Sequence, residues 1–267
     1  MKEKSSSSRE EKLEALGRLL DVLERLRVEC PWDAKQTNES LRPNTIEEVY
    51  ELSEAIINEN HPEIAKELGD VLLHVLFYAK IGEEKGQFDL ADVCNREADK
   101  LIFRHPHIYG DVQVNNAHDV ELNWEQIKLK EKGGNKTVLA GVPKGLPSII
   151  KSYRVQEKVA NVGFDWAEKS DVWDKVYEEL GELRAEIEGN GDLAHKEGEM
   201  GDFLFSLINM GRLYSVDPDT SLERTNQKFI RRFNYIEASA KAEGKSLKEM
   251  TLGEMDALWN EAKSQEI

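Results

Sequence analysis

The sequence predicts an all-α protein made of two related helical halves, and three observations support this fold class. Apolar residues recur three and four positions apart, the spacing of one helix face, in stretches such as 13–26 and 46–52. Strand-like alternation flanked by hairpin turns is hard to find. Glycine and proline gather in GGNKTVLAGVPKGLP at 133–147, where no helix could continue without interruption.

The length of the chain favours two domains. With 267 residues, of which 39% are apolar, it can bury two separate cores. We place a flexible N-terminus at 1–12, a first helical domain at 13–130, a Gly/Pro linker at 131–148 and a second helical domain at 149–267.

Composition excludes several classes of partner. The formal net charge is −16, so polyanions are repelled and a nucleic-acid partner is disfavoured. No apolar run approaches the ~20 residues of a membrane span, and MKEKSSSSREEK at the N-terminus lacks the hydrophobic core of a signal peptide. Cys30 and Cys94 have neither metal-ligand spacing nor the density of a disulfide scaffold. These features predict a soluble, cytoplasmic protein without a membrane partner.

One acidic pattern occurs twice. It reads EEVYELSEAI and ELGDVLLHVL at 47–56 and 67–76, and EELGELRAEI and EMGDFLFSLI at 178–187 and 199–208. At offsets of 131 or 132 residues, the corresponding carboxylates are Glu48, Glu51, Glu67 and Asp70 in the first half and Glu179, Glu182, Glu199 and Asp202 in the second. Three further residues correspond across the halves: Lys100, Arg104 and Trp124 match Lys228, Arg232 and Trp259. The pattern predicts a tandem duplication.

The spacing of the carboxylates predicts a metal site in each half. Residues three apart share a helix face, and the turn-forming GNGD at 189–192 is expected to fold the second helix of that half back against the first. Four carboxylates brought together repel one another unless a cation lies among them. Oxygen ligands without His or Cys favour Mg2+, with Mn2+ possible. A solvated acidic face is the ordinary alternative, but recurrence among apolar neighbours favours the metal.

The motifs resemble those of a known family. CPWDAKQTNESLRPNTIEEVYELSEAI…ELGD and KVYEELGELRAEI…EMGD…NQKFIRRF are similar to the MazG nucleoside triphosphate pyrophosphohydrolases of the all-α NTP pyrophosphatase superfamily. The resemblance covers nearly the whole chain past residue 12. It implies Mg2+-dependent hydrolysis of NTPs or dNTPs to the monophosphate and pyrophosphate, the eight carboxylates as metal ligands, and tandem MazG-type helical bundles in a dimeric assembly like a four-helix bundle.

Other residues are candidates for substrate contacts. Glu178 could orient the attacking water, although a solvated or salt-bridged side chain is an equal alternative. Cations suited to phosphates are Lys175, His195, Lys196, Lys228, Arg231 and Arg232. Trp259 could stack on a base or belong to the core. Lys100, Arg104 and Trp124 are weaker counterparts in the first half.

The two halves differ one helical turn before their ligands. Lys175 and His195 precede Glu179 and Glu199, whereas Asn44 and Glu63 precede Glu48 and Glu67. This difference predicts that the C-terminal half performs most of the hydrolysis.

Two other functions stay open: a house-cleaning hydrolase specific for dUTP, dCTP or a damaged nucleotide, and a nucleotide-sensing or interaction module without turnover. A homodimer is expected, although the two halves of one chain could pair instead. The residues do not determine base and sugar preference, metal count, activity of the first half or cellular role.

Overall fold

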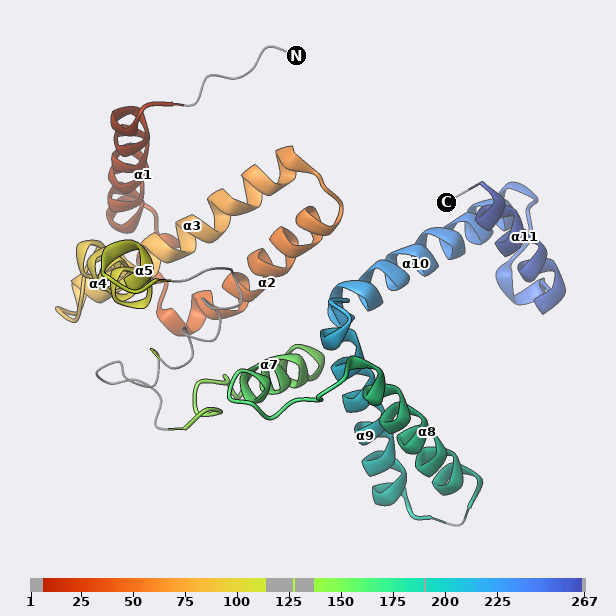
Figure 1. Cartoon of the computed structure of the whole chain (residues 1–267). Coiled ribbons are helices and arrows are strands. Elements are labelled where there is room, and N and C mark those ends of the chain that lie inside the picture. Colours follow the sequence, from red (N-terminus) through yellow and green to blue (C-terminus); the bar gives the residue numbers. More distant parts are fainter. Residues whose placement is uncertain (1–6, 114–126, 128–136, 190, 266–267) are drawn as a thin grey trace. The chain divides into compact units, whose positions relative to one another are not determined.

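The computed structural model describes residues 7–113, 127, 137–189 and 191–265, and these form helices joined by short turns (Figure 1). None of the described residues lies in a strand, which confirms the all-α fold class. No helix in this part of the chain has the length and apolar character needed to cross a membrane.

The chain divides into two compact units, residues 1–112 and 113–267, which are described separately. The predicted end of the first domain, at residue 130, lies outside the described residues, as does Trp124. Residues 137–147, in the predicted linker, form turns, and the next helix begins at Ser148.

Unit 1 begins with a helix that starts earlier than the sequence suggests. Helix α1 (Arg9–Glu29) begins inside the stretch 1–12 that the sequence predicts to be flexible. The Ser8 hydroxyl accepts a hydrogen bond from the Glu11 backbone N–H, and the Glu11 carboxylate accepts one from the Ser8 backbone N–H. This capping box satisfies two backbone donors that would otherwise lack partners, so the helix is stable from Arg9 onward.

The acidic motif of unit 1 lies on a helical hairpin. After a short 3-10 turn, η1 (Asp33–Lys35), come α2 (Asn38–Ile57) and α3 (His61–Glu84), which run antiparallel beside each other (Figure 1). The unit ends with α4 (Leu90–Arg104) and α5 (Pro106–Tyr109). The buried core of the unit joins α1 to this hairpin and consists of Leu23, Leu41, Leu76, Phe77 and Ile81. Full burial of such side chains stabilises the fold by about 1.5–3 kcal/mol each, so the hairpin is held in place.

A buried arginine also ties α1 to α3. The Arg27 guanidinium donates from Nε and Nη2 to the two carboxylate oxygens of Glu84, at 3.0 and 2.6 Å. Its Nη1 donates to the backbone carbonyls of Asp33 and Gln36. The hydrogen bond from Arg27 holds the pKa of the Glu84 carboxyl below its usual value. One side chain therefore connects α1, α3 and the turn that precedes α2.

Replacing Glu84 by glutamine is expected to destabilise unit 1 by about 1 kcal/mol near neutral pH, because a mostly buried guanidinium loses its partly exposed anionic partner. The pKa of Glu84 is lower in the folded state than in the unfolded state. Its contribution is therefore fully present above the ordinary glutamate pKa of about 4.3 and is lost as the pH falls through the folded-state pKa. Urea unfolding of wild type and Glu84→Gln should show a difference at neutral pH that disappears in acid. Glu29→Gln, which removes the exposed partner of Arg25, is the control with little expected effect; an equal loss for Glu84→Gln at both pH values would contradict the prediction.

Unit 2 also contains a helical hairpin. Helix α7 (Ser148–Ala160) and the 3-10 turn η2 (Lys169–Asp171) precede α8 (Val172–Glu188) and α9 (Leu193–Leu213), which run antiparallel (Figure 1). This arrangement confirms the predicted reversal between the two helices, and Asp192 caps α9 by accepting from the backbone N–H of His195. Helices α10 (Pro218–Ala242) and α11 (Leu252–Ser264), with the 3-10 turn η3 (Leu247–Glu249) between them, complete the unit.

Candidate active site

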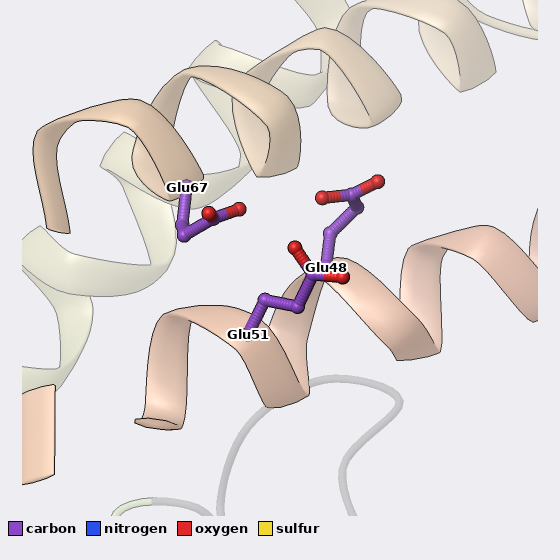
Figure 2. Close-up of side chains that lie close together, drawn as sticks. All are labelled: Glu48, Glu51 and Glu67. Carbon is purple, nitrogen blue, oxygen red and sulfur yellow. The ribbon is translucent and has the colours of Figure 1, made fainter. Parts of the chain in front are cut away.

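Three glutamates meet between α2 and α3. Figure 2 shows Glu48 and Glu51 on α2 and Glu67 on α3, with their carboxylates directed into the space between the two helices. One carboxylate oxygen from each lies within 4.8 Å of the other two. Glu48 and Glu51 share a face because they are three residues apart, and the antiparallel return of the chain places Glu67 opposite them. The structure thus brings together three of the four carboxylates predicted for this half.

Glu67 is the most deeply buried of these carboxylates, with 1% of its surface exposed. Its Oε1 lies 2.6 Å from Nζ of Lys66, which also contacts Glu63 at 2.8 Å. Its Oε2 is buried and has no hydrogen-bond partner among the described residues. A buried carboxylate oxygen without a partner is unfavourable, and hard divalent cations prefer oxygen ligands of this kind. The residues therefore fit a cation such as Mg2+.

The fourth predicted ligand of the first half, Asp70, is not in the group of three. Its charge nevertheless reaches Glu48. The pKa of Glu48 is raised, first by desolvation and then by the negative charges of Asp70, Glu51 and Glu67. The four carboxylates thus form one acidic environment in which a bound cation would relieve repulsion.

Unit 2 has two overlapping groups of carboxylates, and Glu179 belongs to both. Glu178, Glu179 and Glu182 on α8 form one group, and Glu179 forms the other with Glu199 and Asp202 on α9. Within each group the oxygens lie within 4.8 Å of one another. Glu179 is the buried member. All four predicted ligands of the second half therefore lie around Glu179.

A lysine also accompanies this cluster. Nζ of Lys175 lies 2.6 Å from Glu179 and 3.0 Å from Glu178, and these two partners raise its pKa. On α9, the pKa of Glu199 is raised, first by desolvation and then by the charges of Glu182 and Asp202. Glu178 forms a salt bridge with Lys175 in this structure. This agrees with the alternative from the sequence that Glu178 is solvated or salt-bridged.

A cavity of about 700 Å³ opens beside the carboxylates of unit 2. Helices α7, α8 and α9 and the segment between α7 and α8 contribute its walls. Lys175, Glu179 and Asp202 lie in the lining, together with Phe164, Trp166 and Asn209 from other parts of the wall. The volume lies within the range of about 300–1,000 Å³ that is usual for small-molecule sites. The arrangement can hold a ligand that has both an anionic part and a flat, partly apolar part.

The other predicted substrate residues lie in different surroundings. Trp259 on α11 packs against Phe229, with ring centroids 5.0 Å apart, and the Arg232 guanidinium lies 5.4 Å from its ring. The structure thus brings Arg232 and Trp259 together, although neither is in the lining of the cavity. Lys228 and Arg231 are exposed on α10. On α9, His195 Nδ1 lies 2.9 Å from Asp192 Oδ1 at the helix start, next to Lys196.

Lys100 and Arg104, the weaker candidates of the first half, both lie on α4. Lys100 forms an ion pair with Glu97, one turn away on α4. Arg104 lies at the end of the same helix. These two residues therefore occupy one helix, as their spacing predicts, and their role toward phosphates stays a prediction.

Several residues of the site are not among those predicted. Lys66 was missed because it directly precedes Glu67 in the sequence. The residue one helical turn before Glu67, which shares its helix face, is Glu63. With Lys66 on Glu67 and Lys175 on Glu179, both halves pair a lysine with a buried carboxylate. Gln156, Asn209 and Arg212 were also missed, since helical polar residues give no local signal of a cavity; the aromatic residues of VGFDW at 162–166 are the one sequence feature that could have indicated it.

Comparison with known proteins identifies the family. A model described as the MazG nucleotide pyrophosphohydrolase domain matches residues 36–109, which include the acidic motif of unit 1. The chain is also 39% identical over 258 residues to the nucleoside triphosphate pyrophosphohydrolase of Escherichia coli K12, an alignment that covers 94% of this chain and 98% of that protein. The chain belongs to the MazG family.

Other relatives agree with this assignment. This chain is 41% identical over 248 residues to nucleoside triphosphate pyrophosphohydrolase/pyrophosphatase MazG of Thermotoga maritima. The alignment covers 92% of this chain and 94% of that protein. Protein YabN of Bacillus subtilis is 46% identical over 238 residues, but the alignment covers only 49% of that longer protein. The alignments with the first two relatives include both carboxylate clusters because they span nearly the whole chain.

Proposed function

We propose that this chain hydrolyses nucleoside triphosphates to the monophosphate and pyrophosphate, with Mg2+ or Mn2+ as cofactor and mainly at the site in unit 2. As a member of the MazG family, the chain is a nucleoside triphosphate pyrophosphohydrolase. The metal and the division of labour between the halves are our proposal. The observation that supports it most strongly is the cavity beside Glu179, because one wall offers metal-binding carboxylates and a lysine while another offers aromatic side chains.

The residues of unit 2 fit each requirement of the reaction. Hydrolysis adds water at the α-phosphorus and breaks its bond to the bridging oxygen, so that pyrophosphate leaves. Glu179, Glu199 and Asp202 would hold the cation, which when bound supplies charge neutralisation and a more acidic water. Lys175 can turn from its carboxylate partners toward a phosphate oxygen. Glu178 is adjacent and exposed, so it can orient the water or accept its proton.

Comparison of the two hairpins supports the C-terminal half as the main site. The offset of 132 residues that relates Asp70 to Asp202 places Phe77 at the position of Asn209 and Leu73 at that of Phe205. Phe77 is 3% exposed and belongs to the core of unit 1, and Leu73 packs against that core. Two positions that line the cavity in unit 2 thus correspond to apolar packing in unit 1. The first half keeps the carboxylates, but at these two positions its side chains belong to or pack against its core.

We further propose that the chain forms a homodimer through the hairpins. Large apolar side chains are exposed on the helices that bear the carboxylates, namely Val49, Tyr50, Leu68 and Leu72 in unit 1 and Tyr177, Leu180, Met200 and Leu204 in unit 2. Apolar faces of this kind on a two-helix hairpin are commonly buried by a second subunit. Sedimentation equilibrium should give the mass of a dimer; a monomer at micromolar concentration would contradict the proposal.

The activity is tested with the purified full-length chain. ATP, dGTP, dCTP and dUTP are each incubated with Mg2+, with Mn2+ or with EDTA, and the products are separated by chromatography. We expect monophosphate and pyrophosphate with either metal and no turnover with EDTA. Diphosphate and inorganic phosphate would indicate attack at the γ-phosphorus and contradict the proposed reaction. Turnover of dUTP or dCTP alone would instead support the narrower house-cleaning function.

A further inference from the structure

The wall of the cavity in unit 2 contains a fixed network that starts from Arg212 on α9. Its Nη1 and Nη2 donate to the two carboxylate oxygens of Asp165, at 2.9 and 2.5 Å. Its Nε and Nη2 also donate to Oδ1 of Asn209, one turn earlier on the same helix, at 3.1 and 2.8 Å. The Arg212 side chain is only 12% exposed, and its bonds to Asn209 are partly buried. Arg212 is thereby held in a single orientation.

This network determines how the Asn209 amide is oriented. A guanidinium has only donors, so the amide must turn its oxygen, not its nitrogen, toward Arg212. Nδ2 therefore faces away from Arg212 and retains its donors, for which no hydrogen bond is found within the described part of the chain. Asn209 lies in the lining of the cavity. The network thus presents one oriented amide donor to a ligand.

A complementary acceptor lies in the same wall. Gln156 on α7 is 4% exposed, and its Nε2 donates to the backbone carbonyl of Phe205 at 2.8 Å. Its Oε1 is buried without a hydrogen-bond partner among the described residues. Leaving such an acceptor unpaired is unfavourable, so a ligand that donates to it gains the bond without losing one to water. Gln156 also lies in the cavity lining.

Aromatic surfaces and the metal-binding carboxylates belong to the same cavity. Phe164 is 80% exposed and Trp166 is 38% exposed, although both belong to residue types that are usually buried. Exposed aromatic rings are general stacking surfaces for heterocyclic bases. Lys175, Glu179 and Asp202 lie in the same lining and suit a triphosphate with its cation. A nucleotide can therefore occupy the cavity with both of its ends recognised.

We propose that this cavity binds the base of the nucleotide substrate, with Asn209 donating from Nδ2 to an acceptor of the base and Gln156 accepting from one of its N–H groups. Arg212, fixed by Asp165, is a positioning residue that acts through Asn209. This inference rests on the proposed function of unit 2 and names the part of the substrate that the wall recognises. Trp259 lies outside the lining of this cavity, and its stacking on a base stays a separate prediction.

The first test uses Asn209→Asp and Asn209→Ala in the full-length enzyme. Aspartate keeps an oxygen for Arg212 but removes the donor, whereas alanine removes both. We expect both variants to raise KM for NTPs about fivefold to tenfold, the effect of one hydrogen bond, with kcat changed less than about twofold. Inhibition by inorganic tripolyphosphate, which has no base, should keep its wild-type constant. Circular dichroism and thermal unfolding check that each variant folds, and Asn95→Asp, at an exposed helical asparagine of unit 1, is the matched control.

The second test asks whether Arg212 acts through Asn209. Arg212→Lys removes the paired contacts with Asp165 and should raise KM in the wild-type background while adding little in the Asn209→Ala background. Arg184→Lys, which alters an exposed pair with Glu188 on α8, should leave KM unchanged in both backgrounds. Additive effects of Arg212→Lys and Asn209→Ala would overturn the positioning role.

The outcomes separate this inference from the proposed function. If wild type releases no pyrophosphate from any NTP, the proposed function fails. If wild type is active but both Asn209 variants keep the wild-type KM, or if they weaken inhibition by tripolyphosphate as much as they raise KM for NTPs, the base-binding role is overturned while the hydrolase stands.

Discussion

Replacing Glu179 by glutamine is expected to reduce NTP turnover by on the order of 10²–10³-fold, the effect of removing one major electrostatic contact to a reacting centre. Glu179 is buried, belongs to both carboxylate groups of unit 2 and lies in the lining of the cavity. Glutamine keeps the shape of the side chain but removes the negative charge, so cation binding should weaken while the helix persists. Initial rates of pyrophosphate release over a range of Mg2+ concentrations measure the change.

Glu48→Gln in unit 1 is the matched comparison, because Glu48 is the corresponding first predicted ligand of the other half. We expect this variant to keep most of the wild-type rate. Loss of turnover in Glu48→Gln with full activity in Glu179→Gln would reverse the proposed ranking of the halves. Equal losses in both variants would show that the two sites depend on each other.

Replacing Glu67 by glutamine is expected to change the stability of unit 1 in opposite directions with and without metal. In EDTA the variant should be more stable than wild type by about 1 kcal/mol, because Lys66 pairs with only one of the two Glu67 oxygens and the neutral side chain no longer repels Glu48 and Glu51. With Mg2+ at 100 times its Kd, wild type should gain about 2.7 kcal/mol, and the variant should gain much less. Calorimetric unfolding in EDTA and in Mg2+ measures both differences.

Glu63→Gln provides the control on the same helix. Glu63 is the other, more exposed partner of Lys66 and is not in the carboxylate group. Its replacement should therefore leave the gain from Mg2+ unchanged. If Glu67→Gln gained as much from Mg2+ as wild type, Glu67 would not be a metal ligand.

Much of the fold follows from local sequence signals. The apolar spacing indicates helices, and GNGD at 189–192 indicates the reversal between α8 and α9 because turn residues there interrupt the helical pattern. The start of α1 at Arg9 is less apparent, since SSSS suggests a flexible tail until the reciprocal bonds of Ser8 and Glu11 are considered. The core of unit 1 depends on which faces meet, and periodicity alone does not determine that.

The candidate site also contains residues that the sequence predicts and residues that it does not. The carboxylates were predictable because their chemistry and spacing are visible in sequence and occur twice. Gln156, Asn209 and Arg212 were not, because their importance arises from contacts between helices: Gln156 becomes notable only when its amide meets the carbonyl of Phe205, 49 residues away. Lys66 was not predictable for a different reason. It is adjacent to Glu67 in sequence, and adjacent residues of a helix do not share a face, yet its ammonium group contacts the Glu67 carboxylate.

The lysines at the two clusters bear on how the protein would acquire the metal ion that we propose. Lys66 and Lys175 each place an ammonium group 2.6 Å from a buried glutamate, so each cluster already has an internal counter-ion. The chain can therefore reach its folded form before a divalent ion arrives, unlike domains whose folding waits for their metal. Under the proposed metal-dependent function, an incoming ion would take over a carboxylate that the ammonium had neutralised, and the released lysine would become a positive charge available to a polyphosphate.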